Sequence, residues 1–554
     1  MISLKEKLPS DKYIELKRIG RIIDKLYDVT EKNQDILINQ ILSFMEINPK
    51  IIRHIINNMF TISKRRFRIA DRFGEILTRI ACFNSDYRFL IQDELCINFK
   101  HNNLLLLHYC CRHGLFQPFS DLMRAAKNYY VDNNLIIWTY EMMVYFSKFL
   151  YQHDIDYYNK QFEHFQNIYG TQKIYDCLRD GPKDDFEKLL YFIDYTDNRD
   201  SLRSILYNDD LEKFLGFLEK RRIHKQSLDP KEFDLGDADV YGNKKFFDIV
   251  SFAPSLKIFE YLLTTTSYVQ QYMSENWMRG GCVEIIKHLP KKMISEYYYI
   301  LSEYHHIPIL EWAVSYKGDI NLVEAFAKDN NITYLLEEST EIDDIDSLGS
   351  NELLCSNNCS EILLIKLYLS EDINELKALI ESAIQYDLGL VLEEFILYQD
   401  TFVKDDAQRR TILVDSLVTA LSKRALIKYN ILEPTVNRST YYEKSSYCFK
   451  LLFSEGVYKL YRGNDTLTLY DIAYCNSFFN AFRMLVSRSS PANFHPDQYI
   501  GVNQFYKKVL MRYEFPVHTI PDMDTITAYG IGQYYNEDNL DNLDNEDRED
   551  SSDQ

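Results

Sequence analysis

Apolar residues recur along most of this chain at spacings of three and four, which is the period of an α-helix with one buried face. The segment 246–327 shows this pattern in short pieces, each after a turn-prone start. The first piece carries four apolar residues on one face: Leu256, Phe259, Leu262 and Leu263. A two-turn helix is unstable alone in water, because nucleation costs more than so few hydrogen bonds return. We therefore expect short helices that stack on one another as repeats.

Residues 1–100 are expected to be helical throughout, because three longer stripes with helical spacing follow one another. The stripes comprise Ile19, Ile22, Ile23 and Leu26, then Ile51, Ile52, Ile55, Ile56 and Met59, then Ile69, Phe73, Ile76, Leu77 and Ile80. The segment 64–68 (Lys-Arg-Arg-Phe-Arg) is the densest basic cluster. We interpret it as a solvated helix end, with a nuclear-localisation or nucleic-acid-binding patch as the alternative.

The segment 105–115 resembles the ankyrin phrase T-P-L-H-x-A-A-x-x-G-H. His108 takes the histidine position, Cys110 and Cys111 take the two small positions, and Gly114 takes the glycine position. A small pair lets this helix pack closely on a neighbour, and the glycine supplies the left-handed residue that ends the helix. A metal site in this segment is disfavoured, because residues at such spacings point in different directions on a helix.

Four fragments between residues 205 and 312 occur in a familiar order and at a familiar spacing. They are Ile205–Leu215, Phe252–Leu263, Gly280–Ile286 and Ser302–Trp312. In this the chain resembles the divergent ankyrin-repeat proteins that some unicellular parasites carry in large paralogous families. The resemblance covers residues 200–330 best, with outlying matches at 103–123 and 463–486. It implies an α-solenoid of ankyrin-like repeats that binds proteins, and it brings no catalytic residues.

The fragments depart from the ankyrin pattern in one turn and in their register. Pro254 stands where the turn glycine is expected, and turn positions near 254, 281, 305 and 318 give two similar gaps and a last gap of about half their length. Two registers stay open. In the first, 304–312 spans the middle of a repeat. In the second, 309–314 is a first helix and 318–326 is its partner. Because the last gap is half a unit, at least one repeat is expected to be irregular.

The chain is too long for one hydrophobic core, since 554 residues exceed the roughly 250–300 at which such cores stop growing. With 43 Tyr and 33 Phe against 18 Gly and 13 Pro, its composition favours an all-α fold. We expect a helical N-terminal region at 1–180, with an ankyrin-like hairpin near 103–125, and a repeat solenoid at 200–488. An irregular segment at 489–535 and an acidic, disordered tail at 536–554 should follow.

The charge balance limits the classes of partner and the cellular location. A net charge of −20 argues against nucleic acid as a partner. No signal peptide and no apolar run of the ~20 residues that span a bilayer is present, so we expect no membrane span. The ten cysteines are scattered and form no CxxC pair. We therefore expect reduced thiols in a cytoplasmic protein, with the nucleus as the alternative location.

Sequence motifs that carry chemistry are absent. The chain has no phosphate-binding loop, nucleophile elbow, zinc-protease helix or kinase signature, so we expect no enzyme activity, no cofactor and no metal. His305 and His306 stand beside Glu303, but adjacent helical residues diverge by about 100°. A packed or exposed role is therefore expected for the two histidines. Tyr297 and Tyr298 combine apolar area with a polar tip, which suits a binding surface.

The leading functional hypothesis is a non-catalytic scaffold or adaptor that binds protein partners through hairpin tips and the concave helix face. The candidate partner-binding residues are Tyr241, Asn243, Lys244, Lys245, Tyr297, Tyr298, His305 and His306. One alternative is a substrate-recruiting adaptor whose N-terminal region docks on a ubiquitin ligase or a similar complex. The other is an enzyme with an unrecognised site.

Overall fold

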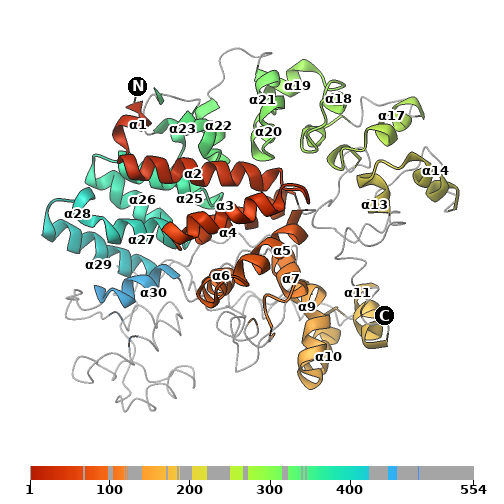
Figure 1. Ribbon diagram of the computed structural model, residues 1–554, viewed down its shortest axis with the longest axis horizontal. Coiled ribbons are helices and arrows are strands. Elements are labelled where there is room, and N and C mark those ends of the chain that lie inside the picture. Colours follow the sequence, from red (N-terminus) through yellow and green to blue (C-terminus); the bar gives the residue numbers. More distant parts are fainter. Residues whose placement is uncertain are drawn as a thin grey trace, which may run out of the picture. The chain divides into compact units, whose positions relative to one another are not determined.

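The computed structural model describes residues 2–66, 69–97, 104–117, 140–169, 173–183, 202–220, 250–265, 273–314, 322–337, 341–342, 346–422 and 447–457, with the single residues 119, 122, 186, 469 and 485. Most of these residues are helical (Figure 1). The one strand pairing among them joins β1 (Ile2–Ser3) to β2 (Glu341–Ile342), antiparallel. The prediction of an all-α chain is confirmed at this level. The acidic tail and the repeat-like piece at 463–486 lie almost entirely outside the described residues.

The chain divides into two compact units, and the boundary falls between residues 369 and 370, within the segment 200–488. Unit 1 comprises residues 1–127 and 134–369, and unit 2 comprises 128–133 and 370–554. The unit 1 helices up to residue 183 are α1 (Leu4–Lys7), α2 (Ser10–Tyr27), α3 (Gln34–Ile47), α4 (Ile51–Arg65), α5 (Ala70–Ala81), α6 (Ser85–Ile97), α7 (Leu104–Arg112), α9 (Tyr140–His153), α10 (Ile155–Tyr169), α11 (Lys173–Asp180) and the 3-10 helix η3 (Gly181–Lys183).

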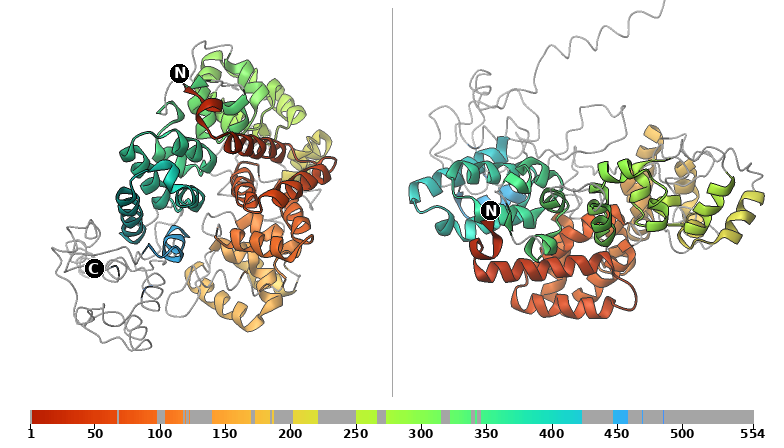
Figure 2. Two further views of the ribbon diagram at one scale, coloured as in Figure 1. Left: turned by 60° about the vertical axis from the view of Figure 1, so that its left-hand side comes forward. Right: turned by 90° about the horizontal axis from the view of Figure 1, so that it is seen from above.

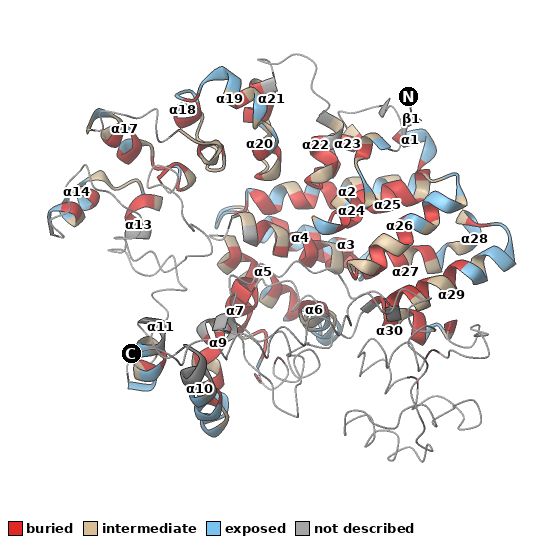
Figure 3. Cartoon of the chain, turned by 180° about the vertical axis from the view of Figure 1, so that it is seen from behind, coloured by how far each residue is buried: buried red, intermediate tan, exposed pale blue. Residues whose placement is uncertain are grey.

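The N-terminal helices form a packed series in which each helix from α2 to α5 contacts the next one and the next but one. Their predicted stripes are buried except for Ile69, which is partly exposed, and Figure 3 shows buried residues along α4, α5 and α7. Helices α5 and α7 come close together at Gly74, where an added Cβ would lie 2.8 Å from the backbone carbon of Tyr109. Gly114 has φ +84 and follows the end of α7, as predicted from the glycine position.

The remaining helices of unit 1 pair as hairpins around sharp turns. These elements are α13 (Leu202–Tyr207), α14 (Leu211–Lys220), α17 (Leu256–Thr265), η6 (Glu275–Met278), α18 (Val283–Ile286), α19 (Lys291–Glu296), α20 (Tyr299–Glu303), α21 (Ile307–Val314), α22 (Leu322–Lys328), α23 (Ile332–Glu337), η7 (Asp346–Leu348), α24 (Asn351–Ser356) and α25 (Ser360–Leu369). The hairpins are α13–α14, residues 250–252 with α17, η6–α18, α20–α21, α22–α23 and α24–α25.

Each of these turns contains a residue with positive φ, and most of these residues are not glycine. The turn positions are Asp209, Pro254, Gly281, His305, Asn330 and Asn358, and from Pro254 onward they recur at a nearly even spacing. In five of the six turns, the next residue donates its N–H to the carbonyl five positions back, for example from His306 to Leu301 (2.7 Å). This is the Schellman pattern, which satisfies free carbonyls at a helix end.

The structure decides between the two registers left open around Trp312. Helix α20 ends before His305 and α21 begins after it, so 304–312 spans the middle of a hairpin, as in the first register. The half-unit step was predicted from a turn near 318, whereas the next described turn after His305 falls at Asn330, a full repeat further along the chain. Gly318 stands between α21 and α22 in the sequence and lies outside the described residues.

Hydrogen bonds join the turns of successive hairpins, and we call this set the turn ladder. In each rung, the side chain after the positive-φ position bonds to a carbonyl at the end of the preceding hairpin's first helix. The rungs are Ser255 Oγ to Leu206, His306 Nε2 to Arg279 (2.9 Å), Asn331 Nδ2 to Ser302 (3.5 Å) and Cys359 Sγ to Lys328 (3.0 Å). At the remaining junction Gly280 lies so close to Ser251 that an added Cβ would overlap its carbonyl oxygen.

Unit 2 contains one further hairpin of the same kind among its described residues. Its helices are α26 (Ile373–Gln385), α27 (Gly389–Leu397), α28 (Gln399–Phe402), α29 (Asp406–Ser422) and α30 (Tyr447–Ser454). The turn between α26 and α27 holds Asp387 at φ +59, and Leu388 donates its N–H to the carbonyl of Ala383 (2.8 Å). The Asp387 carboxylate accepts the N–H of Cys448 at the start of α30 (2.9 Å).

Candidate functional site

The structure describes four of the eight residues predicted to bind a partner. Tyr241, Asn243, Lys244 and Lys245 lie outside the described residues. Tyr297 and Tyr298 are partly exposed between α19 and α20, whereas His305 and His306 belong to the turn between α20 and α21. The structure therefore separates the tyrosines from the histidines.

His305 faces into unit 1, and its side chain is only 10% exposed. Its ring stacks on Tyr27 of α2, with centroids 4.2 Å apart and planes inclined by 9°. Its Nε2 atom lies 3.3 Å from a carboxylate oxygen of Asp24, and its Nδ1 atom contacts Asn331 Oδ1. These contacts engage both ring nitrogens and one ring face within the protein.

His306 is held as a neutral imidazole. Arg66 approaches Nδ1 (3.2 Å), so Nδ1 must act as the acceptor and Nε2–H donates to the carbonyl of Arg279 (2.9 Å). Burial, and then the charge of Arg66, lower the pKa of His306 to about 4. Gly281 leaves room for the ring, because an added Cβ there would overlap the imidazole.

We expect His306 to make unit 1 less stable as the pH falls. A histidine with a lowered folded-state pKa contributes stability above its unfolded value near 6.5, and this is lost as the pH falls toward 4. When the pH falls from 7.5 to 4.5, the free energy of unfolding of wild type should decrease by about 2–3 kcal/mol more than that of His306→Gln, whose side chain at position 306 does not titrate. Urea denaturation of both proteins at several pH values in this range measures the difference between their free energies of unfolding. The contributions of other titratable groups are the same in both proteins and cancel in this difference. A difference that stays constant with pH would contradict the assignment.

Helices α2 and α4 lie against the turns of α20 to α25, and we call these contacts the turn seam. Figures 1 and 2 show α2 beside α23, and Tyr13 of α2 donates to the carbonyl of Leu336 (2.8 Å). Helix α2 comes very close at Gly20, where an added Cβ would lie 2.7 Å from Thr333 Oγ1. The seam therefore joins the start of the chain to segments that are far from it in the sequence.

The interpretation of the basic cluster as a solvated helix end is wrong for its two central arginines. Arg66 donates to the carbonyls of Tyr27 (3.0 Å) and Tyr304 (2.6 Å). Arg65 donates to Tyr27 Oη (3.3 Å) and pairs with the carboxylate of Asp329 (3.5 Å). Burial raises the pKa of Asp329 to about 6, and Arg65 opposes that shift. The same contacts leave both arginines little free surface for nucleic acid.

Glu361 is the centre of a second set of seam contacts. It is fully buried at the start of α25, and its carboxylate accepts bonds from His54 (2.9 Å), Asn58 (3.1 Å) and Asn330 (2.7 Å). Although burial opposes it, the hydrogen bond and charge of Glu361 raise the pKa of His54. Sequence reasoning missed Glu361, because its partners His54, Asn58 and Asn330 lie far from it in the sequence.

The predicted tyrosines Tyr297 and Tyr298 are partly exposed and lie beside Tyr299, which was not among the predicted residues. Tyr299 is 38% exposed, and its ring lies near those of Tyr297 (6.2 Å) and Tyr298 (6.5 Å). The ammonium group of Lys328 lies 5.6 Å from the Tyr299 ring centroid, which is a cation–π distance. These residues form an exposed aromatic surface with a positive charge at its side.

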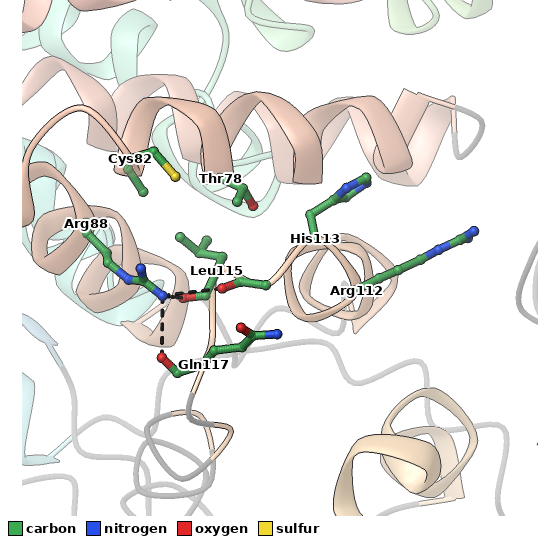
Figure 4. Close-up of a pocket in the computed structure, with 9 residues that line it drawn as sticks. Thr78, Cys82, Arg88, Arg112, His113, Leu115 and Gln117 are labelled. Carbon is green, nitrogen blue, oxygen red and sulfur yellow. Dashed lines mark hydrogen bonds between the residues drawn. The ribbon is translucent and has the colours of Figure 1, made fainter. Parts of the chain in front are cut away.

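A groove of about 220 Å³ lies between α5, α6 and the turn after α7 (Figure 4). Sequence reasoning missed this groove, because its lining residues come from helices that are separated in the chain. The lining residues are Thr78, Ala81, Cys82, Arg88, Arg112, His113, Gly114, Leu115 and Gln117. Arg88 donates to the carbonyls of Gly114 (3.3 Å), Leu115 (3.0 Å) and Gln117 (3.5 Å) across the groove.

Within the described part of the chain, no group of three or more His, Cys, Asp or Glu side chains is arranged to hold a metal ion. His108, at the histidine position of the ankyrin phrase, is buried and its Nδ1 atom contacts the carbonyl of Tyr145 (2.6 Å). Burial raises the pKa of Cys110, which keeps this thiol protonated. Among the described helices, none is both long and apolar enough to cross a membrane.

Comparison with protein-family models, with curated proteins and with solved structures gives no match for this chain.

Proposed function

We propose that this chain is a non-catalytic scaffold that binds other proteins with a stack of ankyrin-like hairpins. The turn ladder is the observation that carries the proposal. Each repeating unit consists of two short helices with a left-handed residue between them, and a side-chain hydrogen bond joins it to the previous hairpin. Such a unit is stable only beside its neighbours. Such stacks present extended surfaces for partners, whereas enzymes need a convergent polar site.

Exposed aromatic residues support protein as the partner class. Tyr299 lies beside Lys328, and Phe83 and Phe89 are 66% and 72% exposed. Aromatic and arginine side chains contribute strongly to protein interfaces, and the net charge of −20 disfavours nucleic acid. A cytoplasmic location, with the nucleus as the alternative, belongs to the same proposal.

The ubiquitin-ligase alternative gains no support from the structure. It requires an N-terminal region that is free to dock elsewhere. Helices α2 and α4 instead contact the hairpins through Arg66, His54 and Tyr13.

Site-specific crosslinking tests the proposal. Benzoylphenylalanine placed at Tyr299 or Phe89 of the full chain should crosslink the same small set of proteins in repeated cell extracts. Lys183 is 81% exposed and lies outside both surfaces, so the probe there is the matched control. If the Tyr299 and Phe89 probes gave only the pattern of the Lys183 probe, the scaffold proposal would be overturned.

A further inference from the structure

The outward side of helix α2 carries a row of basic residues in an acidic chain. Arg18, Arg21 and Lys25 are all exposed, and their spacings of three and four place them on one helical face. Between Asp11 and Asp28, which bound this face, it carries no acidic residue. The chain as a whole has a net charge of −20, so this row is a local exception to its charge.

One base of the row already binds a carboxylate, and its neighbour does not. Arg21 pairs with Glu337 of α23 (2.8 Å), which shows that a base on this face is accessible to an acid. The ammonium group of Lys25 donates to Gln40 on α3 (2.8 Å), which is a neutral acceptor. An ammonium group has three donors, so Lys25 retains the capacity to bind an acid.

Arg18 offers a complete guanidinium fork. Its guanidinium carbon lies over the ring of Phe44 on α3, 5.7 Å from the ring centroid. A cation–π contact holds the group in place but supplies no oxygen acceptor. Among the residues that the structure describes, no hydrogen bond or ion pair engages Arg18. Two neighbouring N–H donors of the fork are therefore available together, which is what a bidentate bond to a carboxylate needs.

Two exposed isoleucines lie one helical turn from the contact between Arg18 and Phe44. Ile14 is one turn before Arg18 and is 49% exposed, and Ile47 is one turn after Phe44 and is 70% exposed. The helices lie side by side (Figures 1 and 2) and run antiparallel, since contacts nearer the start of α2 fall nearer the end of α3. Both isoleucines therefore lie toward the same end of the helix pair.

We propose that this α2 surface, made by Ile14, Arg18, Lys25 and Ile47, docks an acidic amphipathic helix of a partner protein. One carboxylate binds the fork of Arg18, a second carboxylate binds Lys25, and an apolar side chain covers the two isoleucines. Charge complementarity selects this occupant. The inference rests on the proposed scaffold function and assigns a partner chemistry to one surface of the scaffold.

The spacing of the α2 surface predicts the pattern of its ligand. Arg18 and Lys25 are two turns apart, which corresponds to about 10 Å along a helix. A partner helix laid along α2 repeats this spacing when it carries two acids seven positions apart, with an apolar residue one turn beyond one of them. An anionic membrane fits less well, because polybasic membrane sites contain roughly four to eight basic residues and this row contains three.

Peptide selection on the full chain tests the proposal. Helical peptides that are randomised on one face and displayed on phage are selected against wild type. Fluorescence polarisation then measures the affinities of the recovered peptides. We expect the predicted pattern of two acids and an apolar residue in these peptides. Arg18→Gln and Ile14→Ser should each weaken binding about 10-fold, the loss expected for a charged hydrogen bond or a newly buried apolar side chain.

Two exposed substitutions elsewhere serve as matched controls. Arg410→Gln removes the same charge from a helix of unit 2, where this arginine pairs with Asp406 (2.8 Å). Ile155→Ser removes an isoleucine of α10 that is 51% exposed, close to the value for Ile14. Both controls should leave peptide affinity unchanged. Because the Ile14 side chain is half in solvent, Ile14→Ser also provides a test that is independent of how well Arg18→Gln folds.

Three outcomes would overturn the assignment of the α2 surface. They are failure to recover peptides, recovery of peptides that lack the pair of acids, and binding that survives both Arg18→Gln and Ile14→Ser. Phosphatidylserine vesicles that bound wild type but not Arg18→Gln, without peptide binding, would replace the partner helix by a membrane. The crosslinks expected from Tyr299 do not depend on α2, so failure here is distinguishable from failure of the scaffold proposal.

Discussion

Glu361→Ala is expected to lower the free energy of unfolding of unit 1 by about 3–5 kcal/mol, the usual cost of removing one partner of a buried ion pair. The carboxylate is fully buried and accepts bonds from His54, Asn58 and Asn330. Its removal takes one acceptor from the His54 ring and from each of the two amide groups, away from water. Each unsatisfied group adds a desolvation penalty.

Tryptophan fluorescence during urea denaturation measures this loss. Trp138, Trp277 and Trp312 all fall within the residue range of unit 1, so the signal reports that unit alone. Glu260→Ala, at an exposed position on α17, is the matched control and should change stability by less than about 0.5 kcal/mol. Equal midpoints for Glu361→Ala and Glu260→Ala would show that the buried contacts do not stabilise the seam.

Gly280→Ala is expected to destabilise unit 1 by about 3 kcal/mol, at the upper end of the range for overpacking. The added methyl group would overlap the backbone oxygen of Ser251, and a backbone atom cannot rotate away as a side chain can. Because Gly280 lies at a junction between hairpins, the strain should loosen both of them.

Gly216→Ala is the control, and its effect should have the opposite sign. Gly216 lies inside α14 with nothing within 4 Å of an added Cβ. Replacing an unobstructed helical glycine by alanine stabilises a helix by about 0.5–1 kcal/mol. The same fluorescence assay compares the two variants. If Gly280→Ala unfolded at or above the wild-type urea midpoint, the close approach of the two hairpins would be wrong.

The all-α class could be predicted because apolar spacing records which face of a helix is buried. The register of α20 and α21 was left open between two alternatives, because the same spacing fits both. The turns were harder to predict. Glycine marks a left-handed residue in a sequence, and it did so at Gly114. At His305 and Asn330 the left-handed residue carries a side chain that contacts the seam, so no glycine marks the turn.

The basic cluster and the groove depend on contacts between distant segments, which a local pattern does not contain. In the sequence, nothing distinguishes Arg66 from an exposed arginine at a helix end. Only the fold brings the carbonyl of Tyr304 within hydrogen-bond distance of it. The groove likewise exists only because the turn after α7 folds back toward Arg88. Arg66 proved to be engaged inside unit 1, whereas Arg88 lines a surface groove.

The turn seam sets an order of events during synthesis of the chain. His54 and Glu361 are 307 positions apart, and Arg66 and Tyr304 are 238 positions apart. At about 5–20 residues per second, a ribosome needs about 15–60 s to make Glu361 after His54 has been made. For most of that interval α2 and α4 are complete, while Tyr304, Asp329 and Glu361, the later partners of Arg66, Arg65 and His54, do not yet exist. A nascent chain paused before residue 361 should therefore engage chaperones through its N-terminal helices and release them when α25 emerges.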